Sequence, residues 1–142
     1  MLFRSQGVAA WLPPRLGEPY QTFVSAVDAD GNEMAGIRLP DLTVPLATYT
    51  GWNPRHSTQG APEQSLRMHG ATMPFATTQS ARERSGDPRP SIAERYASQA
   101  VYLALVTKAA ETLVAEGYLL SADLDGLVQR AAWRYDLFTQ QP

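Results

Sequence analysis

The chain has 142 residues, of which 44% are apolar and 18% charged, and its formal net charge is −2. This composition fits one globular domain, or part of one, and excludes the weakly hydrophobic, highly charged class of disordered chains. The weakly acidic balance excludes a basic nucleic-acid interface, and the absence of cysteine excludes disulfides, iron–sulfur clusters and thiolate zinc sites.

Proline and glycine divide the chain into two parts. Ten of the eleven prolines and eight of the ten glycines precede Ser91. Because proline neither continues a helix nor donates to a strand ladder, we expect a β-hairpin and extended segments in residues 1–90, followed by a helical segment in residues 91–142. Together these segments predict an α+β fold. No apolar run approaches the ~20 residues of a membrane span, and we expect no signal peptide; the compartment is left open.

The first predicted element is a β-hairpin. Residues 21–26 (QTFVSA) and 33–39 (EMAGIRL) flank the turn sequence DADGN. Asp, Asn and Gly supply the positive-φ positions that a tight reversal needs. The order Asp28-x-Asp30-Gly31 resembles the beginning of a calcium loop, but the glycine is at the fourth position instead of the sixth. We therefore predict a hairpin turn and no metal site.

A short strand and a loop-rich stretch come next. VPLATYT at 44–50 has the composition of a strand, and Pro45 confines it to a sheet edge or a strand start. Residues 51–75 are predicted to be rich in loops. Within 82–95, arginines alternate with acidic residues, which favours a solvated surface that neutralises itself.

One polar and aromatic cluster in this stretch is the predicted binding site. An indole beside glycine, with hydroxyl, amide and guanidinium groups around it, could line a ligand pocket. The alternative is that the tryptophan fills a core or an interface and the asparagine caps a turn. The residues of this cluster are Tyr49, Thr50, Trp52, Asn53 and Arg55.

The two histidines, His56 and His69, give a weaker signal. Zinc would need further ligands, and Glu63 is the only acid between Asp41 and Glu83. We predict exposed loop histidines, with a metal site or histidine-based catalysis as minor hypotheses. No metal and no other cofactor is predicted.

The second part carries clear helix signals. Ser91-Ile-Ala-Glu94 is a capping box, and a long helix is predicted from Ser98 to Glu116 with Gly117 after its end. Ser121 is expected to cap a last helix, and the short link makes the two helices an antiparallel hairpin. Trp133 and Tyr135 give this hairpin more aromatic surface than it can cover alone. The predicted apolar faces are Tyr102, Val106, Ala109 and Leu113, and then Leu124, Leu127, Val128, Ala131, Tyr135 and Phe138.

Five segments carry a resemblance to a known family in their order and spacing. They are RLGEPY (15–20), VDADGNEMAGIRLP (27–40), VPLATYTGWN (44–53), SGDPRPSIAERY (85–96) and LVAEGYLL (113–120). On these segments the chain is similar to the C-terminal region of α/β-hydrolase domain-containing proteins, and the resemblance extends from Arg15 over nearly all of the remaining chain. It implies a serine-type, esterase-like or lipase-like protein in which this region is an appendage of a larger α/β-hydrolase fold.

The nucleophile of such an enzyme is missing from the chain. A G-x-S-x-G elbow needs small residues for its sharp turn, and the nearest sequence, FRSQG at 3–7, has Phe at the first position. No catalytic residue is therefore assigned. We expect a non-catalytic C-terminal portion whose partner is the hydrolase core, in cis or as a separate chain. Two alternatives are a stand-alone binding or self-associating module, and a small enzyme that uses His56 or His69.

Overall fold

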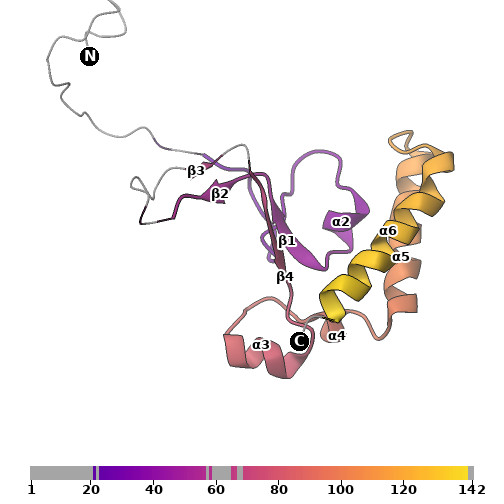
Figure 1. Ribbon diagram of the computed structural model, residues 1–142. Helices are drawn as coiled ribbons and strands as arrows, with labels where there is room; N and C mark the ends of the chain where they lie inside the picture. The colour runs from indigo at the N-terminus through magenta and orange to yellow at the C-terminus, as the bar shows by residue number, and fades with distance from the viewer. Residues whose placement is uncertain (1–20, 22, 57, 59–64, 67–68, 141–142) are drawn as a thin grey trace, which may run out of the picture.

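A computed structural model describes residues 21, 23–56, 58, 65–66 and 69–140 (Figure 1). The mixed helices and strands confirm the predicted α+β class. In chain order the elements are α2 (Pro40–Thr43), β1 (Ala47–Thr50), β2 (Asn53–Pro54), β3 (Ser65–Leu66), β4 (Ala71–Pro74), α3 (Gln79–Ser85), α4 (Ile92–Arg95), α5 (Gln99–Ala115), the 3-10 turn η2 (Ser121–Asp123) and α6 (Leu124–Thr139).

The strands form two small antiparallel sheets. β1 pairs with β4 from Ala47↔Pro74 to Thr50↔Ala71, and β2 pairs with β3. The stretch 51–75, predicted to be rich in loops, therefore contains β2, β3 and β4. These strands were missed because their partners are distant in sequence and their own alternation is too short to be recognised.

The predicted hairpin is present as a turn with one bridge. Gly31 has φ 80°, and Val27 pairs with Glu33. Among the described residues, the flanking segments 23–26 and 34–39 add no further ladder. Phe23 is 84% exposed and therefore does not pack on a sheet. Residues with a strand-like composition form strands only where such packing is available.

Two helices interrupt the extended part that precedes Ser91. α2 begins at Pro40, where proline suits the first helical turn. α3 lies between Thr78, whose hydroxyl accepts from the Ala81 N–H, and Gly86, which has φ 68°. The distribution of prolines did not predict either helix, although the segment between Pro74 and Pro88 is long enough to hold α3.

The helical hairpin is confirmed. α5 and α6 lie side by side and antiparallel (Figure 1), and Ser98 caps α5 by accepting from the Val101 N–H. The Ser91–Glu94 capping box and a positive φ at Gly117 are also present. The predicted cap at Ser121 is wrong, because this residue opens η2 and no side-chain cap bond forms at η2 or α6.

The core lies where the helical hairpin meets β1 and α4. Tyr102 is 1% exposed, and its ring lies 5.1 Å from that of Tyr96 and 5.3 Å from that of Tyr135. The Tyr96 hydroxyl donates to the Pro45 carbonyl at 2.9 Å, which joins α4 to the segment before β1. On α5 the buried alanine is Ala110, while the predicted Ala109 is only partly buried.

Within the described residues, no helix combines the length and the apolar character that crossing a membrane requires.

Candidate functional site

The residues of the predicted cluster at 49–55 have different surroundings in the structure. Tyr49 packs against the core, and burial, followed by nearby Tyr96, raises the pKa of Tyr49 to about 12. The Thr50 hydroxyl donates to the Trp52 carbonyl at 2.6 Å and accepts from the Ala71 N–H at 3.2 Å. Tyr49 and Thr50 are thus engaged in holding the sheet and the core together.

The other members of the cluster lie beyond β1. Asn53 pairs with Leu66 in the β2–β3 sheet, and Trp52 and Arg55 are partly exposed. None of the five residues lines either of the two hollows described below. A binding role for this cluster stays a prediction.

The histidines lie at exposed positions, as predicted. The His56 Nδ1 atom is 2.8 Å from the Thr58 hydroxyl, and His69 lies two residues before the start of β4. Among the described residues, no carboxylate forms an ion pair with either ring. That same part of the chain contains no group of three or more metal-ligating side chains.

A buried polar contact closes one edge of β1. Asn32 is completely buried; its Nδ2 donates to the Ala47 carbonyl at 3.1 Å, and its Oδ1 accepts from the Tyr49 N–H at 2.8 Å. The amide thereby occupies the place of a neighbouring strand. The DADGN turn thus docks on the sheet, a role that its sequence did not reveal.

Two arginines clamp the turn, the sheet and α4 together. Arg95 lies 4.3 Å from the Phe75 ring centroid and pairs with Asp30, with Nη1 to Oδ2 at 2.8 Å. Arg89 lies 5.0 Å from the same ring and pairs with Asp87 at 2.6 Å. These side chains are only 15–18% exposed, so the prediction of a solvated charged surface is wrong here.

Two carboxylates in and beside this clamp have lowered pKa values. Hydrogen bonds from the Arg89 side chain, against a smaller opposing effect of burial, lower the pKa of Asp87 to about 2. Hydrogen bonds from Ser91, assisted by Arg82, lower the pKa of Glu94 to about 2. The carboxylates therefore stay ionised in support of the fold, and neither is poised as a general acid near neutral pH.

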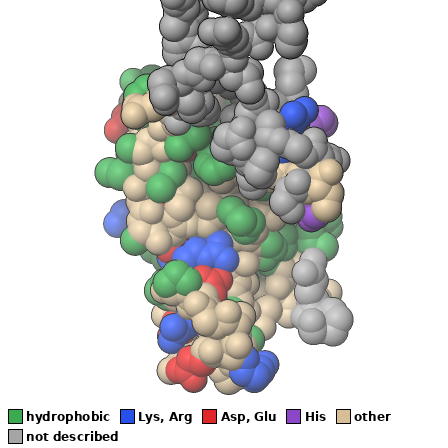
Figure 2. All heavy atoms as spheres, turned by 90° about the vertical axis from the view of Figure 1, so that its left-hand side faces the viewer, with side chains coloured by type: hydrophobic (Ala, Val, Ile, Leu, Met, Phe, Trp, Pro, Cys, Tyr) green, Lys and Arg blue, Asp and Glu red, His purple; other side chains and the backbone are tan. Residues whose placement is uncertain are grey.

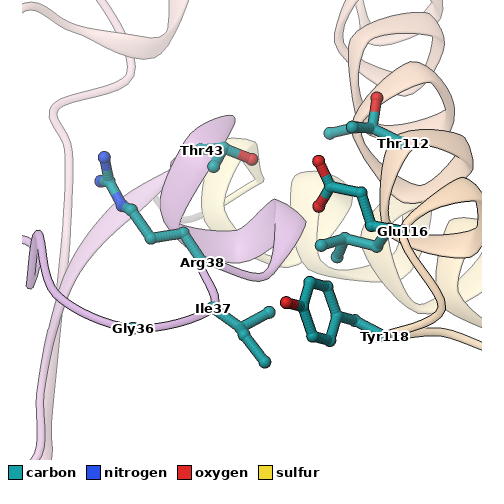
Figure 3. A pocket seen from close by; sticks show the side chains of 9 residues that line it. Gly36, Ile37, Arg38, Thr43, Thr112, Glu116 and Tyr118 are labelled. Atoms are coloured by element: carbon teal, nitrogen blue, oxygen red, sulfur yellow. The ribbon is translucent and has the colours of Figure 1, made fainter.

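The first hollow lies between residues 36–43 and the C-terminal end of α5. It has a volume of ≈ 560 Å³. Figure 3 shows Ile37 and Tyr118 pointing toward each other and Glu116 pointing toward α2. The Arg38 guanidinium points away from α5, where it bonds Asp28 at 2.6 Å. The hollow therefore offers an apolar mouth with one carboxylate beside it.

The second hollow is smaller, ≈ 210 Å³, and lies between the beginning of α2 and the helical hairpin. Its charged lining consists of Asp41 from α2 and of Arg130 and Arg134 from α6, and Arg134 pairs with Asp41. Sequence reasoning missed these residues. The spacing of the two arginines by four places them on one helix face, but nothing local connects them with Asp41.

Large apolar side chains are exposed over several elements. Figure 2 shows groups of hydrophobic side chains on the face at the left of Figure 1, with charged side chains gathered at the lower end, where α3 lies. The most exposed are Phe23 and Leu120, followed by Trp133 at 65%. In the part of the chain that the structure describes, the exposed large apolar residues are Phe23, Val24, Val27, Met34, Ile37, Leu39, Met73, Val101, Leu105, Tyr118, Leu120, Trp133 and Leu137.

Comparison with protein families gives one match. Residues 6–129 match the family described as Alpha/beta hydrolase domain. The chain belongs to this family. Membership confirms the resemblance carried by segments such as VPLATYTGWN, and the mixed helices and strands are consistent with the α+β class. Searches of curated proteins and of solved structures found no match.

Proposed function

We propose that the chain is a C-terminal, non-catalytic portion of a serine-type, esterase-like or lipase-like α/β-hydrolase, and that it packs on or lines the hydrolase core. The observation that carries the proposal is the set of exposed apolar side chains defined above. Contiguous exposed apolar surface marks an interaction site, and this set, which includes Phe23, Leu120 and Trp133, supplies the side chains that such a surface would use.

The small sheets support the same proposal. A two-stranded ribbon is marginal by itself and needs additional strands or a packed helix for stability. Here β1 is closed on one side by Asn32, and β4 ends in Pro74, which has no N–H to offer. The edge of β1 is therefore closed to a further strand, while Pro74 blunts only one end of β4. Packing against a core would give this ribbon the additional support that it needs.

The chemistry available on the chain also supports a non-catalytic role. The sequence has no G-x-S-x-G elbow, and the exposed His56 and His69 have no carboxylate partner within the described residues. A small enzyme built on either histidine would turn over an activated short-chain ester and lose this activity in His56→Ala or His69→Ala. We expect no turnover by the chain alone.

The direct test joins genomic sequence with co-purification. We expect the reading frame upstream to encode a G-x-S-x-G elbow, and a tagged copy of this chain to co-purify with the protein segment that carries it. Trp133→Gln combined with Leu120→Gln should reduce co-purification severalfold. Gln129→Ala, at an exposed polar position of α6, is the matched control and should have no effect. An upstream sequence without the elbow would refute the proposal.

A second candidate is a stand-alone binding or self-associating module. Trp133 and Leu137 lie four residues apart on α6 and are both exposed, which favours an apolar helix face for a second copy. Sedimentation of the purified chain distinguishes the candidates. A dimer that dissociates in Trp133→Gln, with no elbow upstream, would favour the module; its ligand site would then be the Tyr49–Arg55 cluster.

A further inference from the structure

The smaller hollow, between α2 and the helical hairpin, combines apolar walls with charged side chains, and the family assignment gives no role for it. Its walls are mostly apolar and include Val106 from α5 and Leu127 and Ala131 from α6. Protein interiors close such spaces, because an unfilled apolar cavity forfeits packing contacts. A space of ≈ 210 Å³ beside the core therefore has room for a small apolar ligand.

The charged groups at this cavity do not cancel. Two guanidinium groups, from Arg130 and Arg134, face one carboxylate, from Asp41, which leaves one positive charge in excess. Arg134 pairs with Asp41, and burial lowers the pKa of Arg134 from its ordinary value, which shows that this cation is partly removed from water. Arg130 lies at an exposed position and can meet an anion at the rim.

The volume limits the size of the occupant. An engineered apolar cavity of about 150 Å³ binds benzene, which has six non-hydrogen atoms. By proportion, a cavity of ≈ 210 Å³ holds about eight. Five alkyl carbons and a carboxylate, as in hexanoate, make eight non-hydrogen atoms. Such a ligand fits the volume, the apolar walls and the excess positive charge of the cavity.

We propose that the cavity between α2 and the α5–α6 hairpin is a binding site for a short-chain aliphatic monocarboxylate. The carboxylate bonds Arg130, with Arg134 held beside it by Asp41, and the alkyl chain lies against Val106, Leu127 and Ala131. This site does not depend on whether the chain packs on a hydrolase core.

The test is a titration of the full ¹⁵N-labelled chain with hexanoate at constant ionic strength. Hexan-1-ol has the same number of carbons without a charge, and hexylamine has this number with the opposite charge. We expect hexanoate to shift the resonances of Val106, Leu127 and Ala131 in a saturable manner. Its dissociation constant should be about tenfold lower than that of hexan-1-ol, since one charge-assisted hydrogen bond is worth about that factor.

Arg130→Gln identifies the anion contact. Arg130 is exposed on α6, so its substitution should leave the fold intact while weakening hexanoate binding about tenfold and sparing hexan-1-ol. Arg84→Gln, an exposed arginine on α3 that does not line the cavity, is the matched control and should bind as the parent chain does. Absence of saturable shifts, equal binding of the three probes, or unchanged hexanoate binding in Arg130→Gln would each overturn the proposal.

Discussion

The helical hairpin and the β1–β4 region are stabilised in different ways. In the hairpin, α5 and α6 bury apolar side chains spaced at helical intervals, and Ser98 satisfies the start of α5. Such contacts are numerous, and apolar substitutions that keep the side-chain volume are tolerated. The helices therefore tolerate change as long as the apolar faces persist.

The β1–β4 region depends on a few polar side chains that come from elsewhere in the chain. Asn32 closes the edge of β1, and Arg89 and Arg95 both lie against the Phe75 ring while pairing with Asp87 and Asp30. Each of these contacts satisfies a buried or half-buried polar group, so its loss leaves an unpaired partner. The comparison shows why a short sheet persists here: the DADGN turn and α4 replace the strands it lacks.

The largest expected effect is at Tyr102, where both regions meet. Tyr102→Ala should lower the free energy of unfolding by about 3–5 kcal/mol, because it leaves a cavity between Tyr96 and Tyr135. Chemical denaturation followed by circular dichroism measures this change. Tyr118→Ala, at a 58% exposed position, is the control and should stay within about 0.5 kcal/mol. Similar losses in both variants would contradict the assignment of Tyr102 to the shared core.

Asn32→Ala tests the closure of β1. The change leaves the Ala47 carbonyl and the Tyr49 N–H without their partner, and we expect a loss of about 2–4 kcal/mol. Amide hydrogen exchange at Tyr49 should accelerate before exchange in α5 does. Ala29→Ser, at an exposed position of the same turn, is the control and should change neither quantity. Unchanged protection of Tyr49 would show that Asn32 does not act as a substitute strand.

Acid should weaken the β1–β4 region through Asp87. Because the pKa of Asp87 is lowered from 3.8 to about 2, the unfolded chain binds more protons than the folded chain in this interval. The ion pair with Arg89 thus contributes its full stabilisation above pH 3.8, and this is lost as the pH falls toward 2. We expect about 1–2 kcal/mol, after allowing for solvent screening.

Asp87→Asn should flatten the decline of the thermal unfolding midpoint between pH 4 and 2. An identical decline in this variant would assign the acid sensitivity to other carboxylates, of which Glu94 is the first to examine.

The smallest effect separates two serines of the helical region. Ser98→Ala removes a cap bond to the Val101 N–H and should cost about 1 kcal/mol. Ser121→Ala should be close to neutral, because no side-chain cap bond forms at η2 or α6. Thermal unfolding of the pair under one condition decides the matter. Equal losses would restore the sequence-based view that both residues are caps.

The local elements could be predicted because their signals are local. The Ser91–Glu94 capping box, the Ser98 cap and the positive φ at Gly117 each depend on residues within one helical turn. The turn at DADGN belongs to the same class, as does the antiparallel arrangement of two helices joined by a short link. By contrast, β2, β3 and β4 depend on partners that no local pattern identifies.

The candidate sites also differ in whether their signals are local or depend on distant parts of the chain. Composition singled out the Tyr49–Arg55 cluster, but Tyr49 and Thr50 are engaged in the core and the sheet. The smaller cavity, with Asp41 and Arg134 from distant parts of the described chain, could not be inferred from either segment. The excess of two arginines on α6 over one aspartate on α2 can be recognised only when the two helices are seen side by side.

The sequence by itself determined the family, the α+β class, the helical hairpin and the absence of a G-x-S-x-G elbow, because each is written in contiguous residues. Only the tertiary structure decided that Asn32 completes β1, that Arg95 pairs with Asp30 across 65 positions, and that Asp41 meets Arg134. Long-range contacts of this kind gain their strength from burial and mutual geometry, which no segment possesses before the chain has folded.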